Sequence, residues 1–381
     1  MRWEKVKLGD IATFSNGINF NKTAYAKGIK LIGVSNFGDR FYPDYSQLQE
    51  VKKDIVRLED CLRNGDIVFV RSNGNKELVG RCMLVKNPTE RVTYSGFCIR
   101  ARLNDTDRYD PVYFTYYFKS KAFRRAVSGT AVGANIQNLS QARLSNHECR
   151  VPSIEVQHRI ADILSAYDDL IENNQKQIKL LEEAAQRLYK EWFVDLRFPG
   201  YENTKIVDGV PEGWRRGLLK ELISVNYGKD HKKAPDDGNI PVYGSGGLMR
   251  KCNKSLFSGE AVLIPRKGSL NNIMYVDETF WTVDTMFYAT MKQPHTAVFV
   301  YFFVKAFDMY SMNIGAAVPS MTAKILDAMD VVIPDKETLE KFDKCAKTYF
   351  NKIKTLQGQN ERLKTARNLL LPKLMSGEVE V

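Results

Sequence analysis

The chain has 381 residues, of which 44% are hydrophobic and 27% charged, a length typical of two or three globular domains with substantial apolar cores. No apolar run reaches the ~18 residues of a membrane-spanning helix, and the first residues lack the apolar segment of a secretion signal, so we expect a cytoplasmic protein. The 6 cysteines and 4 histidines have no metal-ligand or redox spacing, so neither a zinc site nor a disulfide framework is predicted.

Most of the net charge of +11 lies in the first part of the chain. Residues 1–152 contain 25 Lys and Arg against 15 Asp and Glu, whereas residues 199–334 contain 15 against 14. A basic domain favours a polyanionic partner, because neutralising phosphates provides the non-specific part of nucleic-acid affinity. A basic surface that only keeps the protein soluble is the alternative interpretation.

Residues 1–152 are predicted to form a first globule of mixed α/β structure. Short apolar runs bounded by turn residues predict β-strands at 30–34, 66–70, 81–85 and 97–101. An aromatic stretch from Val112 to Phe123 then predicts a helix, and the polar loop 128–139 follows it.

A long amphipathic helix is predicted from Ile154 to Phe193. Its seam residues recur in alternating steps of four and three, the pattern of a helix that packs along another helix. The seam positions are Ile160, Leu164, Tyr167, Ile171, Asn174, Ile178, Leu181, Ala185, Leu188 and Trp192. Only Asn174 interrupts the apolar series. At ~1.5 Å per residue such a helix would span about 60 Å, which is too long for the core of one small domain.

Residues 194–213 are predicted to be a linker, and the globule after it repeats the first one. Trp214, Leu219, Leu222, Val225 and Gly228 repeat Trp3, Leu8, Ile11, Phe14 and Gly17 at an offset of 211. The segments 240–244, 259–266 and 314–318 likewise correspond to 30–34, 65–71 and 128–132. The chain is therefore predicted to be a tandem duplication of a globule followed by a helix.

The second long helix is predicted from Leu339 to Met375. Adding 182 to each seam position of the first helix gives the same seam, with Asn360 and Arg367 as its polar members. The helix segments have opposite net charge, with 6 basic against 9 acidic residues in 153–198 and 10 against 7 in 335–381, which favours mutual pairing.

The polar seam residues predict an antiparallel pair. In full antiparallel register, residues whose numbers sum to 534 face each other, so Asn174 meets Asn360. A parallel pair would leave each amide against an aliphatic side chain, and a buried amide without a partner costs ~1–3 kcal/mol. The antiparallel register also sets Arg367 against Tyr167, with its head group expected to reach solvent.

Two loops of similar composition follow corresponding strands in the two repeats. Each places basic residues beside amide side chains around a glycine, and such groups bind phosphates, guanine and adenine. Ordinary turn residues are the alternative. The candidate DNA-binding residues are Arg71, Asn73, Asn75 and Lys76 in the first repeat and Arg266, Lys267, Ser269, Asn271 and Asn272 in the second. Asn135, Gln137, Asn138 and Lys324, from the segments that precede the long helices, complete the set.

No catalytic motif is found. The sequence has no phosphate-binding P-loop, no zinc-protease motif and no serine-hydrolase elbow, and the segment 87–90 is only a distant approach to an amino-methyltransferase tetrapeptide. Pro43 and Asp44 with Glu50 and Lys52 spell a short version of a metal-nuclease pattern, whose carboxylates would hold Mg²⁺. A solvated loop is the alternative, since the second repeat has no counterpart.

Bulky apolar residues gather near the ends of both long helices. Tyr189, Trp192, Phe193, Leu374 and Met375 exceed what a two-helix seam requires, so they are candidate anchors for a partner protein. The alternative is that they only pack the adjacent globule.

Three segments carry a resemblance to a known family. Residues 187–201, 211–214 and 368–378 read RLYKEWFVDLRFPGY, PEGW and NLLLPKLMSGE. Together with the tandem halves, they resemble the specificity subunit of Type I restriction-modification systems. The resemblance implies two target-recognition domains, each of which reads half of a split DNA sequence. It also implies that the helices hold two modification (methyltransferase) subunits and, in the larger assembly, restriction subunits.

We therefore predict an α+β fold, in which two α/β target-recognition domains are separated by two long helices paired as an antiparallel coiled coil, in a pseudo-twofold tandem repeat. The expected boundaries are 1–152 for the first target-recognition domain, 153–194 for the first helix, 195–334 for the linker and second target-recognition domain, and 335–381 for the second helix and tail. The predicted function is non-catalytic recognition of double-stranded DNA without a cofactor, while S-adenosylmethionine, ATP and Mg²⁺ act on partner subunits. The alternatives are a self-contained metal-dependent nuclease or DNA methyltransferase, and a coiled-coil scaffold that binds only protein.

Overall fold

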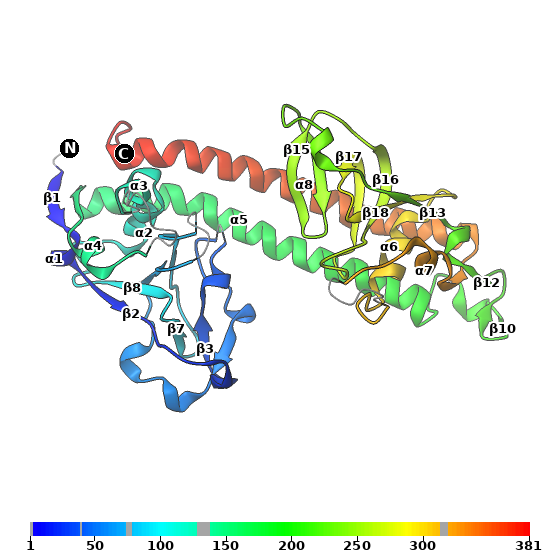
Figure 1. The fold of residues 1–381 in the computed structure, drawn as a ribbon, viewed down its shortest axis with the longest axis horizontal. Coiled ribbons are helices and arrows are strands. Elements are labelled where there is room, and N and C mark those ends of the chain that lie inside the picture. The colour runs from blue at the N-terminus through cyan, green and yellow to red at the C-terminus, as the bar shows by residue number, and fades with distance from the viewer. Residues whose placement is uncertain (1–2, 39, 74–77, 128–137, 313–318) are drawn as a thin grey trace. The chain divides into compact units, whose positions relative to one another are not determined.

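The fold is described from a computed structural model, which covers residues 3–38, 40–73, 78–127, 138–312 and 319–381. The chain divides into two compact units (Figure 1). The first contains residues 1–174 and 358–381, and the second contains residues 175–357. Each unit therefore combines one globule with part of each long helix.

The first globule is built on two small sheets and a separate strand pair. The strands are β1 (Glu4–Lys7), β2 (Ala12–Asn16), β3 (Tyr25–Ile32), β4 (Gln49–Val51), β5 (Ile67–Val70), β6 (Cys82–Leu84), β7 (Val92–Tyr94), β8 (Cys98–Leu103) and β9 (Glu148–Val151). One sheet has the order β2-β8-β5-β6, the other has the order β4-β3-β7, and β1 pairs with β9. The four predicted strands are present as β3, β5, β6 and β8.

The short helices of this globule are α1 (Leu8–Ile11), α2 (Pro111–Lys119), α3 (Lys121–Val127) and α4 (Gln141–Ser145). Aromatic side chains of α2 and α3 pack against the larger sheet. Asp110 caps α2 and Pro111 occupies its first turn, a typical helix start. The single helix predicted at 112–123 is wrong in one respect: Ser120 is extended and ends α2, and its hydroxyl accepts a hydrogen bond from the Phe123 amide of α3.

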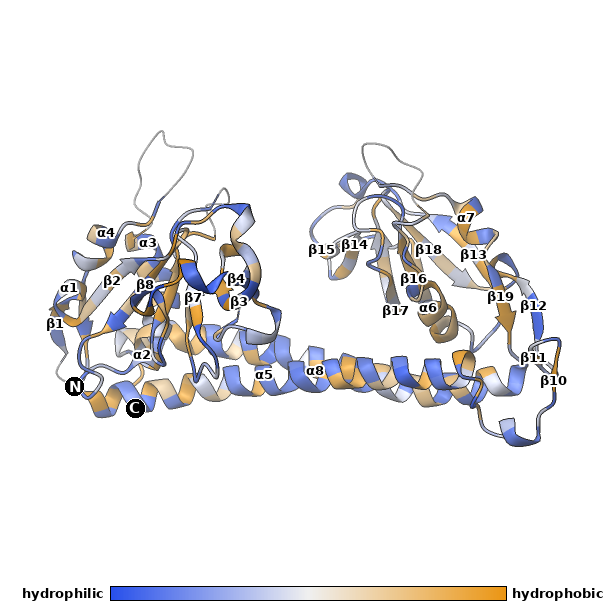
Figure 2. Cartoon of the chain, turned by 90° about the horizontal axis from the view of Figure 1, so that it is seen from below, coloured by the Kyte–Doolittle hydropathy of each residue, from blue (hydrophilic) through white to orange (hydrophobic). Residues whose placement is uncertain are grey.

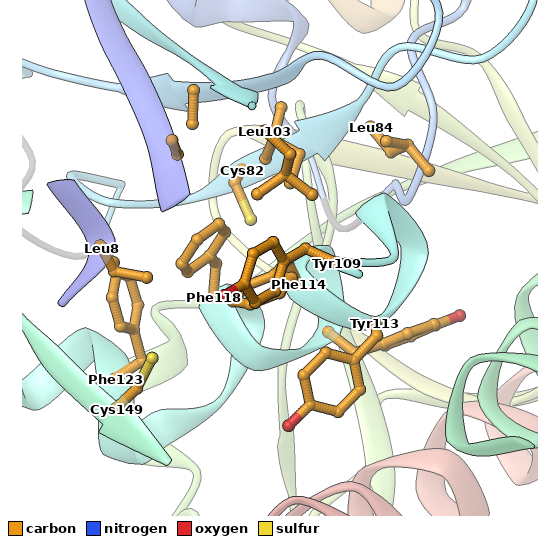
Figure 3. Close-up of a cluster of buried hydrophobic side chains, with 14 of the residues drawn as sticks. Leu8, Cys82, Leu84, Leu103, Tyr109, Tyr113, Phe114, Phe118, Phe123 and Cys149 are labelled. Carbon is orange, nitrogen blue, oxygen red and sulfur yellow. The ribbon is translucent and has the colours of Figure 1, made fainter. Parts of the chain in front are cut away.

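The core of this globule consists largely of buried rings. Phe114 and Phe118 of α2 and Phe123 of α3 are almost fully buried, beside Cys82 and Leu84 of β6 (Figure 3). Burying an aromatic side chain contributes about 1.5–3 kcal/mol, so the aromatic stretch of the sequence is explained by packing.

The second globule has one larger sheet. Its strands are β10 (Ile206–Val207), β11 (Val210–Pro211), β12 (Arg215–Leu218), β13 (Ile223–Tyr227), β14 (Ile240–Gly244), β15 (Gly247–Cys252), β16 (Phe257–Pro265), β17 (Met274–Thr282), β18 (Met286–Met291) and β19 (Asp330–Ile333). The sheet order is β13-β18-β16-β17-β14-β15, with β10 paired to β11 and β12 paired to β19. Helix α6 (Ala297–Lys305), which is almost wholly apolar, lies beside β16 and β17 (Figure 2), and α7 (Ala323–Asp327) precedes β19.

Four strands of the main sheet and one separate strand pair recur in both globules, which confirms the predicted duplication. The order β2-β8-β5-β6 corresponds to β13-β18-β16-β17, and the pair β1-β9 corresponds to β12-β19. The registers agree as well: Val70 pairs with Cys98 in the first globule, and Pro265 pairs with Met286 in the second. The repeat is therefore one of backbone pairing as well as of sequence pattern.

Both long helices are present close to their predicted bounds. The first is α5 (Ile154–Tyr189), continued by a π-helical turn at Lys190–Val194, and the second is α8 (Lys336–Ser376), which contains Pro372. In the first unit Asn174 Nδ2 donates to Asn360 Oδ1 at 2.9 Å, the pair that the antiparallel register predicts. In the second unit the rings of Trp192 and Phe342 lie 5.8 Å apart, and their numbers also sum to 534.

A buried charge cluster joins the first globule to its helices. The Tyr116 hydroxyl of α2 donates to Asp168 at 2.6 Å, and the Arg367 guanidinium of α8 donates to the same carboxylate. Burial, together with Asp168, raises the pKa of Tyr116, so this hydroxyl stays protonated. The prediction that the Arg367 head group reaches solvent is wrong, because its side chain is only 14% exposed.

The second unit fills the equivalent position with apolar side chains. The offset of 186 that relates 128–132 to 314–318 places Phe302 at the position of Tyr116. The helix offset of 182 places Phe350 at the position of Asp168 and Ala185 at that of Arg367. The rings of Phe302 and Phe350 lie 6.1 Å apart, and Ala185 is fully buried. The same layer is thus ionic in one repeat and apolar in the other.

Candidate nucleic-acid interface

Arg71 follows β5 directly and is held at both its backbone and its side chain. Its amide donates to Phe97 O at 2.8 Å, and its carbonyl accepts from the Leu139 amide at 2.9 Å. Its guanidinium Nη1 donates to Gly96 O at 3.2 Å. The turn between β7 and β8 and the segment before α4 therefore meet at the loop that the sequence singled out.

Arg266 follows β16 in the second repeat and has the same set of partners. Its amide donates to Thr285 O at 2.8 Å, its carbonyl accepts from the Met321 amide at 2.9 Å, and its Nη1 donates to Asp284 O at 3.2 Å. Its guanidinium also lies 5.5 Å from the ring centre of Tyr227. Two loops predicted to be equivalent from sequence are therefore equivalent in their hydrogen bonding.

In each repeat a glycine lies close to the segment that binds the arginine. A Cβ atom on Gly17 would lie 2.1 Å from Tyr94 O, and one on Gly228 would lie 1.9 Å from Val283 O, too close for any side chain. The chain therefore passes directly against the segment between β7 and β8 in the first repeat, and against the segment between β17 and β18 in the second. This close approach explains the glycine that ends the repeated opening pattern.

The remaining candidates of the second repeat differ in what their side chains do. Asn271 Nδ2 donates to Asp308 Oδ1 at 2.9 Å and its Oδ1 accepts from the Met309 amide at 2.8 Å, while Asn272 Nδ2 donates to Ser245 O at 2.9 Å. Lys267, Ser269 and Lys324 are exposed.

The first repeat is only partly described at this point. Asn138 is exposed, and its backbone forms an antiparallel bridge with Ser72, as Ser320 does with Lys267. Asn73 lies next to this bridge. Asn75, Lys76, Asn135 and Gln137, together with the sequence match of 128–132 to 314–318, lie outside the described residues.

The five proposed partner anchors lie largely inside the globule cores. Tyr189, Trp192 and Leu374 are 8%, 7% and 1% exposed, and Phe193 and Met375 are partly buried against the same clusters. This burial favours the alternative that they pack the adjacent globule, and partner binding through them stays a prediction.

The carboxylates of the nuclease pattern form hydrogen bonds and an ion pair with nearby residues of the first globule. Asp44 accepts hydrogen bonds from the amide and hydroxyl of Ser46 and pairs with Arg40, while Glu50 Oε2 accepts from the Gly28 amide at 2.6 Å. Within the described ranges, no group of three or more His, Cys, Asp and Glu is placed to hold a metal ion. Within the same ranges, no helix combines the length and the apolar character needed to cross a membrane.

Three residues that the sequence did not single out complete the second loop. Asp308 and Tyr310 contact it, and Tyr227 lies under Arg266. No spacing signal finds Asp308, which is 37 residues from its partner Asn271. Tyr227 could have been identified from the sequence, because it directly precedes Gly228 of the repeated pattern.

Two globules built to one plan, with matching Arg-containing loops, define a class of tandem-repeat proteins with one candidate nucleic-acid interface in each repeat. The model of the Type I restriction modification DNA specificity domain matches residues 1–183 and 211–365, and the chain belongs to this family. Its members are non-catalytic DNA-recognition subunits, so the nuclease and methyltransferase alternatives are not favoured.

Named relatives agree with this assignment, and a solved structure is similar in fold. The chain is 26% identical to the Type I restriction enzyme MjaIX specificity subunit of Methanocaldococcus jannaschii, over 80% of this chain and 76% of that protein. It is 23% identical to the Type I restriction enzyme HindI specificity subunit of Haemophilus influenzae, over 99% of both. In fold it is similar to the crystal structure of a Type I restriction-modification system S subunit from M. genitalium, with a TM-score of 0.59, 18% identity, and coverage of 98% of this chain and 96% of that one.

Proposed function

We propose that this specificity subunit reads a bipartite sequence in double-stranded DNA, one half with each globule. The observation that carries the proposal is the matched construction around Arg71 and Arg266, where the same three backbone elements meet in both repeats. A single recognition site would not require two such loops. The candidate residues of both loops, together with Asn138 and Lys324, are the proposed DNA contacts.

The chain is proposed to direct two modification (methyltransferase) subunits and, in the larger assembly, restriction subunits to the flanking DNA. S-adenosylmethionine, ATP and Mg²⁺ would then bind to those partner subunits. The assembly would work in the cytoplasm. The two target-recognition domains are assigned to residues 1–152 and 195–334, and the helical segments 153–194 and 335–381 are assigned to assembly.

Methylome sequencing tests this function in a host that carries the chain and its modification partner. Wild-type protein should give one methylated motif with two specified halves separated by an unspecified spacer. Arg71→Ala should relax only one half and Arg266→Ala only the other, because a base contact is worth ~1–3 kcal/mol. Arg91→Ala, which changes an exposed arginine of the first globule outside the candidate set, is the matched control and should leave the motif unchanged.

Two results would contradict the proposal. A methylated motif without a second half would show that the repeats do not read separate sequences. Equal weakening of both halves by Arg71→Ala would make this residue a phosphate contact. A chain that serves only as a protein scaffold would show no salt-dependent DNA binding, whereas each neutralised phosphate adds ~0.9 to the slope of log K against log salt.

A further inference from the structure

The loop 266–272 is anchored by a buried side chain at its centre. Leu270 is fully buried in the apolar core of the second globule, although its neighbours Ser269 and Asn271 are exposed. The amide of Gly268 donates to Pro319 O at 3.3 Å, and Gly268 has a left-handed φ of 86°. The loop is therefore a tight turn with a fixed base, and only part of it faces outward.

The turn 308–311 supports one side of this loop. Asp308 Oδ1 accepts from Asn271 Nδ2 at 2.9 Å and from the Tyr310 amide at 3.2 Å. The Tyr310 hydroxyl donates to Gly268 O at 3.2 Å. Met309, between these two residues, is fully buried, so the supporting turn is itself fixed to the core.

Both polar atoms of the Asn271 side chain form hydrogen bonds with the supporting turn. Its Nδ2 donates to Asp308, and its Oδ1 accepts from the Met309 amide at 2.8 Å. An adenine base would need both of these amide atoms for a bidentate contact. Reading DNA with Asn271 would therefore break two hydrogen bonds of the loop, and an acidic side chain beside it would repel phosphates.

Lys267 and Ser269 stand in the opposite situation. Both are exposed, and in the part of the chain that the structure describes neither side chain has a hydrogen bond or ion pair. They flank Gly268, the point at which Tyr310 braces the loop. An ammonium group and a hydroxyl two residues apart are suited to a phosphate or a base edge.

We propose that Lys267 and Ser269 contact DNA beside Arg266 in the second globule, and that Asn271, Asp308 and Tyr310 are positioning residues that hold those contacts in place. This inference rests on the proposed function, which it refines by dividing the loop between contact and support. It assigns roles to Asp308 and Tyr310, and it moves Asn271 from base reading to positioning.

The test is a double-mutant cycle read out as sequence preference. The full chain is bound to a library of randomised DNA duplexes, and the bound fraction is sequenced to give the discrimination at each position. Asn271→Ala and Asp308→Ala should each lower discrimination in the second half of the site by about tenfold, and the double variant should lose no more than either single variant. Asp308→Asn keeps the acceptor oxygen and should stay within about twofold of wild type.

The DNA contacts are tested in the same assay. Lys267→Ala and Ser269→Ala should each reduce binding or discrimination by about fivefold or more, with melting temperatures unchanged. Asn203→Ala, which changes an exposed asparagine of the linker, is the control and should match wild type.

Several outcomes would overturn the inference. Additive losses from Asn271→Ala and Asp308→Ala would mean that Asn271 contacts DNA by itself. An Asn271→Ala variant with a lower melting temperature but full discrimination would have a structural role only. Normal binding by both Lys267→Ala and Ser269→Ala would remove the proposed contacts. If wild-type chain showed no sequence preference at all, the proposed function itself would fail.

Discussion

Removing the guanidinium of Arg367 should strongly destabilise the first unit. Among the residues that the structure describes, Arg367→Ala leaves the Asp168 carboxylate, which is 6% exposed, with the Tyr116 hydroxyl as its hydrogen-bond partner. Breaking a buried ion pair on one side costs about 3–5 kcal/mol, since a charge stays buried without compensation. Because the Arg367 side chain is 14% exposed and the tyrosine bond remains, we expect the lower end, about 3 kcal/mol.

The assay must separate the two units, because a chain with two compact units need not unfold in one step. We suggest urea titration followed by hydrogen-exchange mass spectrometry. Helical peptides of residues 158–172 report on the first unit, and peptides of residues 338–350 report on the second. Arg367→Ala should shift the midpoint of the first set and leave that of the second set unchanged. Arg362→Ala, an exposed arginine on the same helix, is the control.

The second repeat supplies a rescue experiment. Combining Arg367→Ala with Tyr116→Phe and Asp168→Phe gives this layer the three side chains of the second unit. It should recover at least half of the lost free energy, since no buried charge remains. An Arg367→Ala variant within about 0.5 kcal/mol of wild type would refute the reasoning, as would a triple variant less stable than the single one.

Three further perturbations follow from the structure. Asn174→Leu should lower the free energy of unfolding by ~1–3 kcal/mol, because the buried Asn360 amide loses its partner. Adding Asn360→Leu to the same chain should restore part of this free energy in urea titration. A larger loss in the double variant would contradict a shared layer. Burial lowers the pKa of His147, so stability present above the unfolded-state pKa of about 6.5 should be lost as pH falls through the lower folded-state pKa, and His147→Gln should flatten urea midpoints measured across that interval. Gly17→Ala should lower the melting temperature, because its Cβ would meet a carbonyl oxygen at 2.1 Å, whereas Gly38→Ala, with nothing within 4 Å, should not.

The long-range plan of the molecule was predictable because it rests on periodicity. The heptad seam gives both long helices, and the position of its two asparagines gives their direction, since only one register pairs them. The tandem repeat could be predicted because glycines and strand positions recur in the same order, at offsets that fall from 211 in the opening pattern to 182 in the long helices. The strands β4 (Gln49–Val51) and β7 (Val92–Tyr94) were missed because each contains polar residues, whereas β5 and β6, which are similarly short, lie in continuous apolar runs.

The candidate site was predictable only in outline. Arg71 and Arg266 stood out because the same residue follows equivalent strands. The division between contact and support in the second loop was not visible, because it depends on Asp308, far along the chain from Asn271. The Arg367 partner was missed for a related reason: the register names the facing residue, whereas a long guanidinium side chain reaches the next residue, Asp168.

The layer that is ionic in the first unit and apolar in the second also governs how fragments of this protein would associate. If the first repeat alone formed a dimer, the pseudo-twofold relation would set Ala185 where Arg367 now lies and Ile178 where Asn360 lies. Each copy would then bury a carboxylate without its cation and an amide without its partner. Two copies of the second repeat would in turn place Arg367 in an aromatic layer. The polar residues of the seam thus favour the pairing of unlike halves, and they count against products made from either half alone.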